Sequence, residues 1–114
     1  MNYVDGFVAA VKTARREEYR THAEQALSVF KDHGALGVVE TWGDDVPEGE
    51  TTSFTMAVKR EDDESVVFSW VTWPSKEARD AGWAKIMADA RMQGEMPFDG
   101  KRLIHGGFQV IVEG

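Results

Sequence analysis

Histidine is the residue type in this sequence best suited to acid–base chemistry, because its side chain changes charge near neutral pH. His22 falls in a stripe of apolar residues at helical spacing, so we expect it to point toward the interior. His105 precedes Gly106-Gly107, where the missing side chains let a ligand approach the backbone. For both histidines the simpler interpretation is a structural residue within the core. The functional interpretation is a side chain that contacts a ligand.

Two carboxylates, Asp5 and Glu40, interrupt otherwise apolar runs that are typical of strands. A carboxylate buried in such a run must find a partner or raise its pKa, and Arg102 and His105 are available on another predicted strand. An ion pair that orders the sheet is the simpler interpretation. A general base that faces a pocket is the alternative.

Tryptophan supplies the remaining candidates for a ligand site. Trp70 and Trp73 stand in one strand-like run, on opposite alternations, and Trp42 ends another run beside a loop. Aromatic side chains can wall a small-molecule cavity, although most of them belong to a core. The full set of ligand-binding candidates is Asp5, His22, Glu40, Trp42, Trp70, Trp73, Arg102 and His105.

Metal and thiol chemistry have little support. The chain has no cysteine, and its three histidines show no H-x-x-x-H or related spacing. The loop Gly43–Glu50 carries four carboxylates, but their spacing matches no EF-hand and is typical of a solvated loop. We therefore expect no metal and no cofactor.

Charge and hydropathy limit the classes of partner. Thirteen basic and twenty acidic residues give a net charge of −7, and the basic residues are dispersed, so we expect no nucleic-acid binding. No apolar run approaches the roughly 20 residues of a membrane-spanning helix, and the N-terminal residues carry no basic segment. We expect a cytoplasmic protein without membrane association, folded as one domain over residues 1–114.

The predicted strand Ser65–Trp73 organises the rest of the chain, because both of its alternating sets of side chains are apolar or β-forming and need cover. Periodicity, caps and stops predict strands at Tyr3–Val11, Leu36–Trp42 and Arg102–Val112, a helix from Thr13 or Arg15 to Gly34, and a helix from Ser75 to about Ala88. Thr52–Arg60 fits either a short helix or a strand, and we favour the helix.

The order of these elements predicts an α+β fold of the ferredoxin-like βαββαβ type. Right-handed crossovers then give a four-stranded antiparallel sheet of order 4-1-3-2 with both long helices on one face. The other face is apolar as well, and the chain has no third long helix to cover it. A second copy of the sheet would cover it, so we expect a homodimer that assembles as a dimeric α/β barrel.

Four segments resemble the YbaA-like bacterial family of unknown function: Y-V-D-G-F-V, V-V-E-T-W-G-D-D-V-P, V-V-F-S-W-V-T-W-P-S-K-E-A-R-D-A-G and M-P-F-D-G-K-R-L-I-H-G-G-F. The similarity runs from Tyr3 to Val112. It implies a dimeric α/β barrel and no established activity. Trp83 and Ala90 depart from the pattern, where the family leads us to expect a smaller or polar residue and a proline.

The resemblance leaves three classes of function open: a cofactor-independent enzyme, a ligand-binding module and, as the alternative, a structural or interaction dimer. Haem-degrading proteins of similar fold hold iron through a histidine on the second helix, and Ser75–Gly94 contains none, so we expect no haem. We expect any small-molecule site to lie between the sheet and the helices. There His22 should share a cavity with at least two of Asp5, Glu40, Arg102 and His105.

Overall fold

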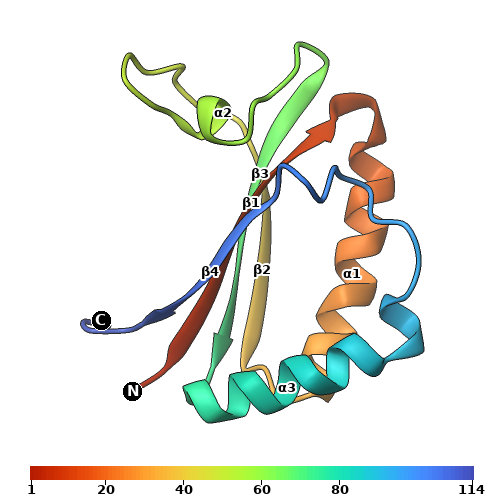
Figure 1. Ribbon diagram of the computed structural model, residues 1–114, viewed down its shortest axis with the longest axis vertical. Coiled ribbons are helices and arrows are strands. Elements are labelled where there is room, and N and C mark those ends of the chain that lie inside the picture. The colour runs from red at the N-terminus through yellow and green to blue at the C-terminus, as the bar shows by residue number, and fades with distance from the viewer.

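The computed structural model describes residues 1–114 and contains a four-stranded antiparallel sheet with two long helices (Figure 1). The strands are β1 (Tyr3–Lys12), β2 (Gly37–Trp42), β3 (Glu64–Trp73) and β4 (Ile104–Gln109). The helices are α1 (Arg16–Asp32), α2 (Phe54–Ala57) and α3 (Lys76–Ala88), with 3-10 turns at Thr13–Arg15 and Ala90–Met92. The sheet order β2-β3-β1-β4 is the predicted order 4-1-3-2 read from the other edge, which confirms the ferredoxin-like α+β fold.

Local sequence signals explain where the helices begin and end. The Ser75 hydroxyl accepts a hydrogen bond from the Ala78 N–H at 3.0 Å and caps α3 as predicted. Ser53 caps α2 in the same way, so the helical interpretation of Thr52–Arg60 is confirmed and the strand interpretation is wrong. Gly34 follows α1 with φ of +107°, the left-handed conformation that favours glycine after a helix.

Strand β4 is shorter than the predicted Arg102–Val112. Its last paired residue is Gln109, which lies opposite Tyr3 at the beginning of β1, so no strand residue remains for pairing beyond it. At the other end, β4 begins at Ile104, opposite Val8, and the Arg102 side chain before the strand bonds the Glu64 carboxylate at 2.7 and 2.8 Å. The start of β1 therefore limits the C-terminal end of a run whose residue types alone favour a longer strand.

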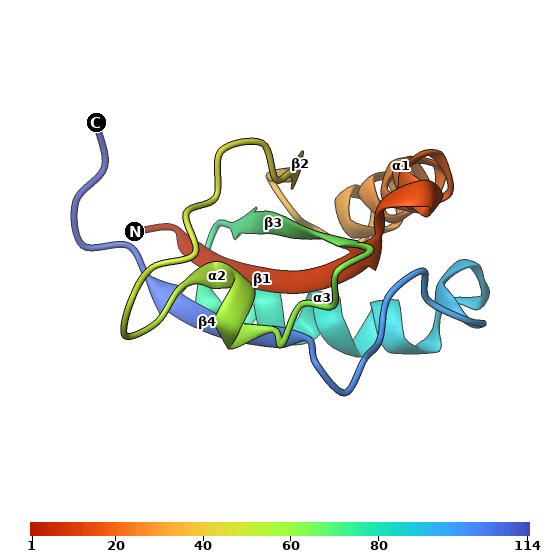
Figure 2. The same cartoon turned by 90° about the horizontal axis from the view of Figure 1, so that it is seen from above.

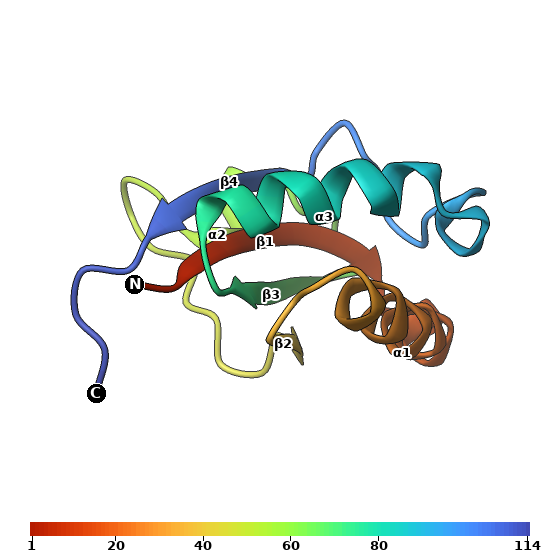
Figure 3. The same ribbon diagram turned by 90° about the horizontal axis from the view of Figure 1, so that it is seen from below.

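Both long helices lie on one side of the sheet. Figures 2 and 3 show α1 toward β2 and β3, and α3 across β1 and β4. A buried core joins Phe30 of α1 and Ile86 of α3 to Val71 and Trp73 of β3. The two helices run at a steep angle to each other, and the chain after α3 runs back past α1 to β4 (Figure 1).

The other side of the sheet is largely open. Strand register places Trp70 on this side and Trp73 on the helix side, as predicted. Helix α2 covers only one end of the open face, where Val58 packs on Ala10 and Val66. The apolar side chains that remain exposed there are Val39 41%, Phe54 50%, Met56 42%, Phe68 41%, Ile104 43% and Phe108 62%. Separately, none of the helices is both long enough and apolar enough to cross a membrane.

Candidate functional site

A cavity of about 330 Å³ lies between the sheet and the two long helices. Its apolar walls come from Val67 and Val71 of β3, Ala26 of α1 and Ile86 of α3. The segment after α3 closes it with Met92, Met96, Phe98 and Leu103. Fourteen of its eighteen lining residues are hydrophobic, so the space suits a largely apolar molecule. We call this space the inner cavity.

The polar groups of the inner cavity are Tyr19 and His22 of α1, Glu40 of β2 and Ser69 of β3. The Tyr19 hydroxyl donates a hydrogen bond to Glu40 Oε2. Helical spacing explains the arrangement, because Tyr19 and His22 stand three residues apart on α1 and therefore face the same side. Strand pairing sets Glu40 opposite Ser69 and turns both toward α1. Four polar side chains thus converge in an otherwise apolar space.

Burial shifts the protonation equilibria of these groups. Desolvation raises the pKa of the Glu40 carboxyl, and the hydroxyls of Tyr19 and Ser69 beside it oppose that effect. Desolvation and the adjacent Glu40 carboxylate raise the pKa of Tyr19, so its hydroxyl stays protonated and donates. Desolvation lowers the pKa of His22, which favours the neutral imidazole at pH 7.

A second space of about 370 Å³, which we call the outer groove, lies between α1 and the edge strand β2. Arg16, Arg20 and Trp42 line it, and the Arg16 guanidinium lies 5.5 Å from the centre of the Trp42 ring. Tyr19 and Glu40 are the two residues that line both the outer groove and the inner cavity. The hydrogen-bonded pair therefore forms a partition between the apolar interior and the solvent.

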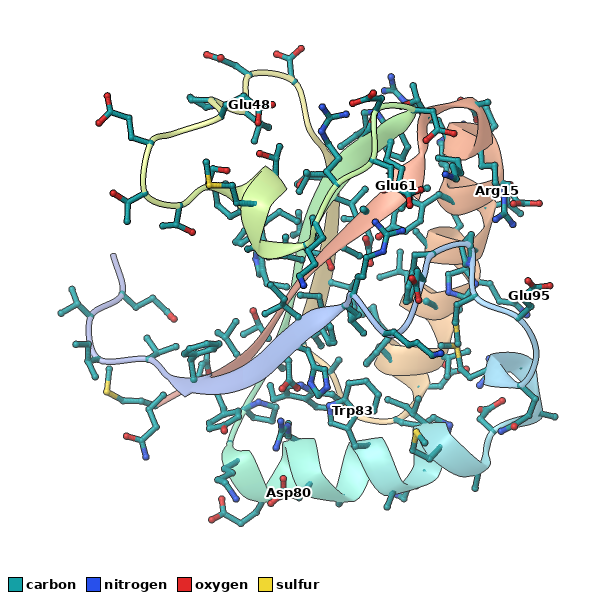
Figure 4. The ribbon with its side chains drawn as sticks, turned by 45° about the horizontal axis from the view of Figure 1, so that its top comes forward. Arg15, Glu48, Glu61, Asp80, Trp83 and Glu95 are labelled. Atoms are coloured by element: carbon teal, nitrogen blue, oxygen red, sulfur yellow. The ribbon has the colours of Figure 1, made fainter.

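Asp5 belongs to a neighbouring recess on the same side of the sheet, under α3. Its carboxylate is 3% exposed and accepts hydrogen bonds from Trp73 Nε1 at 2.9 Å, Trp83 Nε1 at 2.9 Å and Arg79 Nη2 at 2.7 Å. Figure 4 shows Trp83 directed from α3 toward the sheet. With these donors in place the carboxylate holds α3 to the sheet, which supports the structural interpretation of Asp5.

The inner cavity brings together only two of the five polar residues expected there, His22 and Glu40. Asp5 and His105 lie in the neighbouring recess, where His105 stacks on Phe7 with ring centres 6.3 Å apart. Arg102 is bonded to Glu64 at the far end of the sheet. The expectation that two of Asp5, Glu40, Arg102 and His105 would share the cavity with His22 is therefore wrong.

The expected charge partners also differ from those in the structure. Arg79 of α3, rather than Arg102 or His105, pairs with Asp5, and the Tyr19 hydroxyl bonds Glu40. Which side of α3 faces the sheet depends on how the connection between β3 and β4 packs. The sequence therefore did not identify Arg79 as the partner of Asp5. Tyr19 was identifiable, because it belongs to the same predicted helical stripe as His22.

None of the three tryptophan candidates lines the inner cavity. Trp42 lines the outer groove, and Trp70 packs on Phe68 on the open face with ring centres 5.5 Å apart. Trp73 is 0% exposed within the core. Trp83, which was not among the candidates, lines both the cavity and the neighbouring recess.

Solved structures of similar fold include those of two proteins, MhuD and SnoaB. A mutant of MhuD with two manganese protoporphyrin IX bound per active site has a TM-score of 0.60 at 16% identity, over 98% of this chain and 97% of that one. A structure of the heme-degrader MhuD from Mycobacterium tuberculosis, with two hemes in its active site, has a TM-score of 0.54 at 21% identity, over 97% and 98%. A mutant of SnoaB, a cofactor-independent oxygenase from Streptomyces nogalater, has a TM-score of 0.54 at 14% identity, over 98% and 95%. At these identities the likeness shows the fold alone.

Some proteins share a much higher sequence identity with this chain than MhuD and SnoaB do. The chain is 55% identical over 116 residues to the uncharacterized protein YbaA of Escherichia coli strain K12, covering 99% of both chains. The YbaA protein of Shigella flexneri matches to the same extent. Residues 2–100 match the family described as "Protein of unknown function (DUF1428)". The resemblance found in the sequence is thereby confirmed, and the chain belongs to the DUF1428 family.

Proposed function

We propose that the protein binds a small, largely apolar molecule in the inner cavity, and that Tyr19, His22 and Glu40 contact the polar group of that molecule. The observation that carries the proposal is the convergence of these side chains in a space of about 330 Å³ with apolar walls. Small-molecule sites typically measure about 300–1,000 Å³ and combine apolar walls with a few placed polar groups. The size and composition of the inner cavity match that description.

The charge of the lining narrows the ligand class. The inner cavity contains the Glu40 carboxylate and neither lysine nor arginine, so an anionic ligand would meet repulsion without compensation. Glu40 and neutral His22 can both accept a hydrogen bond. We therefore expect a neutral molecule that has an apolar body and one hydrogen-bond donor.

Similarity of fold to MhuD raises the question of haem. Haem carries anionic propionates, and the inner cavity has no cationic side chain to pair with them. Helix α3 contains no histidine to serve as a ligand to iron. The residues present therefore do not fit haem. The residues of the inner cavity are better suited to a ligand that is bound without a cofactor. SnoaB shows that a protein of this fold can be a cofactor-independent oxygenase.

Binding can be tested with N-phenyl-1-naphthylamine, a neutral apolar fluorophore with one N–H donor. We expect its emission to rise saturably on titration with the protein. The Ala26→Phe variant places a large ring in the cavity and should weaken binding about tenfold or more, whereas Ala81→Phe on the exposed side of α3 should not. Equal affinity for Ala26→Phe and wild type, with both folded by circular dichroism, would contradict the proposal.

We also propose that a second copy of the chain covers the open face of the sheet. On this face the central strands present Val4, Val8, Phe68 and Trp70, so two such faces meet without like charges between them. Phe68 and Phe108 stay 41% and 62% exposed in the single chain, which is unfavourable unless a partner buries them. The dimer would form the α/β barrel expected from the sequence.

Light scattering tests the dimer directly. The wild-type protein should give twice the chain mass of 12.7 kDa at micromolar concentration. Phe68→Glu should give a monomer, because it buries a charge in the interface, and Leu27→Glu on the exposed side of α1 should remain a dimer. A monomeric wild type would contradict the proposal. A dimer that binds no small molecule would instead support the alternative, a structural or interaction dimer.

A further inference from the structure

The position of Glu40 between two spaces has a chemical consequence. Its carboxylate faces the apolar inner cavity on one side, and the residue keeps solvent exposure through the outer groove on the other. A proton taken from a molecule in the cavity could therefore leave to solvent without crossing the core. Glu40 is the only carboxylate that lines the inner cavity, and it lines the outer groove as well.

We propose that Glu40 is a general base that removes a proton from a C–H bond, next to an electron-withdrawing group, in a neutral substrate held in the inner cavity. This inference rests on the proposed binding function and adds a reaction class to it. The class is proton-transfer isomerisation or elimination, which needs neither a cofactor nor a second substrate. Glu40 would be the catalytic residue and Tyr19 a positioning residue.

The contacts of Glu40 suit this role. The Tyr19 hydroxyl holds Oε2, and a carboxylate has about four acceptor sites, so capacity remains for a substrate proton. No cationic side chain inside the cavity neutralises the carboxylate, since Arg16 and Arg20 lie in the outer groove. Partial desolvation makes Glu40 a stronger base than an exposed carboxylate, in agreement with its raised pKa.

Ring opening of 5-nitrobenzisoxazole provides a probe for such a base. In the reaction the base takes the proton of the ring C–H bond next to nitrogen. The electron pair of that bond completes a nitrile, the N–O bond breaks, and its electron pair passes to the oxygen of the product phenolate. Atoms and electrons balance without an oxidant, a reductant or water. The probe is neutral and aromatic, as the apolar walls of the inner cavity require, and its acidic C–H group takes the place of the hydrogen-bond donor opposite Glu40.

Three variants test the assignment. Glu40→Gln keeps the size of the side chain but removes the base, and we expect kcat/KM to fall about 100-fold. The affinity for N-phenyl-1-naphthylamine should be kept, because the glutamine amide oxygen can still accept the hydrogen bond of the fluorophore N–H. Glu17→Gln, on the exposed first turn of α1, should react like wild type. If Glu40→Gln does not fold, Glu40→Asp retracts the carboxylate by one methylene and should lower kcat/KM about tenfold.

The pH profile provides a second readout. The rate needs ionised Glu40, so it should rise with pH to a plateau, with a midpoint above the ordinary 4.5 of glutamic acid. Tyr19→Phe removes a hydroxyl that lowers the pKa of Glu40, so the midpoint should move upward. The titratable and charged groups facing Glu40 are Arg16, Tyr19, Arg20, His22 and Glu24, all on α1.

The outcomes separate this inference from the proposed binding function. If the fluorophore does not bind, the binding function fails and this inference fails with it. If the fluorophore binds but wild type shows no saturable ring opening, or Glu40→Gln loses less than about tenfold in kcat/KM, only the general base is overturned. A loss of about tenfold or more with retained binding, together with the shifted midpoint in Tyr19→Phe, supports it.

Discussion

Two indole N–H groups and a guanidinium meet at the carboxylate of Asp5, which makes this residue the main polar link between the sheet and α3. The sequence indicated that a carboxylate in an apolar strand needs a partner, and this is confirmed. The identity of the partner was not predictable, because Arg79 lies 74 residues away and reaches Asp5 only when α3 crosses β1 as it does. The residue type therefore predicted that Asp5 needs a partner, and tertiary packing determined that the partner is Arg79.

Replacing this carboxylate tests its role. Asp5→Asn leaves Arg79 without its buried counter-charge, so we expect the free energy of unfolding to fall by about 3 kcal/mol in urea denaturation. Asp80→Asn removes an exposed partner of the same Arg79 and should cost less than about 1 kcal/mol. Equal losses for the two variants would contradict the structural role assigned to Asp5.

Glu64 gives the protein a defined response to acid. The Arg102 guanidinium holds the pKa of this buried carboxyl at about 2, below its ordinary 4.5. The stabilisation is therefore complete above about pH 4.5 and is lost as the pH falls toward 2, and it amounts to about 3 kcal/mol. In urea denaturation, the free energy of unfolding of wild type should exceed that of Glu64→Gln at pH 6, and most of this difference should be lost at pH 2.5. A difference in unfolding free energy between the two proteins that does not change with pH would contradict the assigned role of Glu64.

At the scale of elements, α3 can pack closely on β3 because residue 82 is glycine. A β-carbon at Gly82 would overlap the Trp73 ring and approach the His33 carbonyl oxygen. Gly107 allows a similar approach, since a β-carbon there would overlap the Tyr3 ring. The Tyr3 side chain thus fills the space beside Gly107, where the sequence suggested the approach of a ligand. The packing role of Gly82 was not recognised inside a helical pattern.

The Gly82→Ala variant separates packing from helix propensity. Propensity alone would make alanine in α3 more stable by about 1 kcal/mol. Because the added methyl group meets the Trp73 ring, we expect Gly82→Ala to lower the free energy of unfolding instead, by about 1–3 kcal/mol in urea denaturation. A more stable Gly82→Ala protein would show that α3 does not sit against Trp73.

Local signals predicted most of the elements but not the cover of the cavity. Periodicity, serine caps and Gly34 located β1, β3, α1 and α3 to within a few residues. Residues 93–100 have no periodicity and were predicted to be irregular, yet Met96 and Phe98 from this segment line the inner cavity. Leu103, from the beginning of the predicted strand Arg102–Val112, lines it as well. The placement of these residues depends on long-range contacts, which patterns of neighbouring residues in the sequence do not predict.

At the scale of the whole molecule, the sheet separates two apolar surfaces to which we assign different roles. The helix side holds the inner cavity, as expected from the inward stripe of α1, and the open side is the face we assign to a second copy. Sequence alone did not fix which side Asp5 and Glu40 face, because a shift of one residue in strand register would reverse them. The expected cytoplasmic location and lack of nucleic-acid binding stay predictions.

The methionines offer the most direct test of whether the inner cavity is the binding site. Of the five methionines, Met87, Met92 and Met96 line the cavity, whereas Met1 lies at the N-terminus and Met56 beside the open face. The measurement is a spectrum of methyl-labelled methionine during titration with N-phenyl-1-naphthylamine. We predict that the signals of Met87, Met92 and Met96 shift together and saturate while those of Met1 and Met56 stay unchanged. A shift confined to Met56, or no shift at the three cavity methionines, would contradict the account.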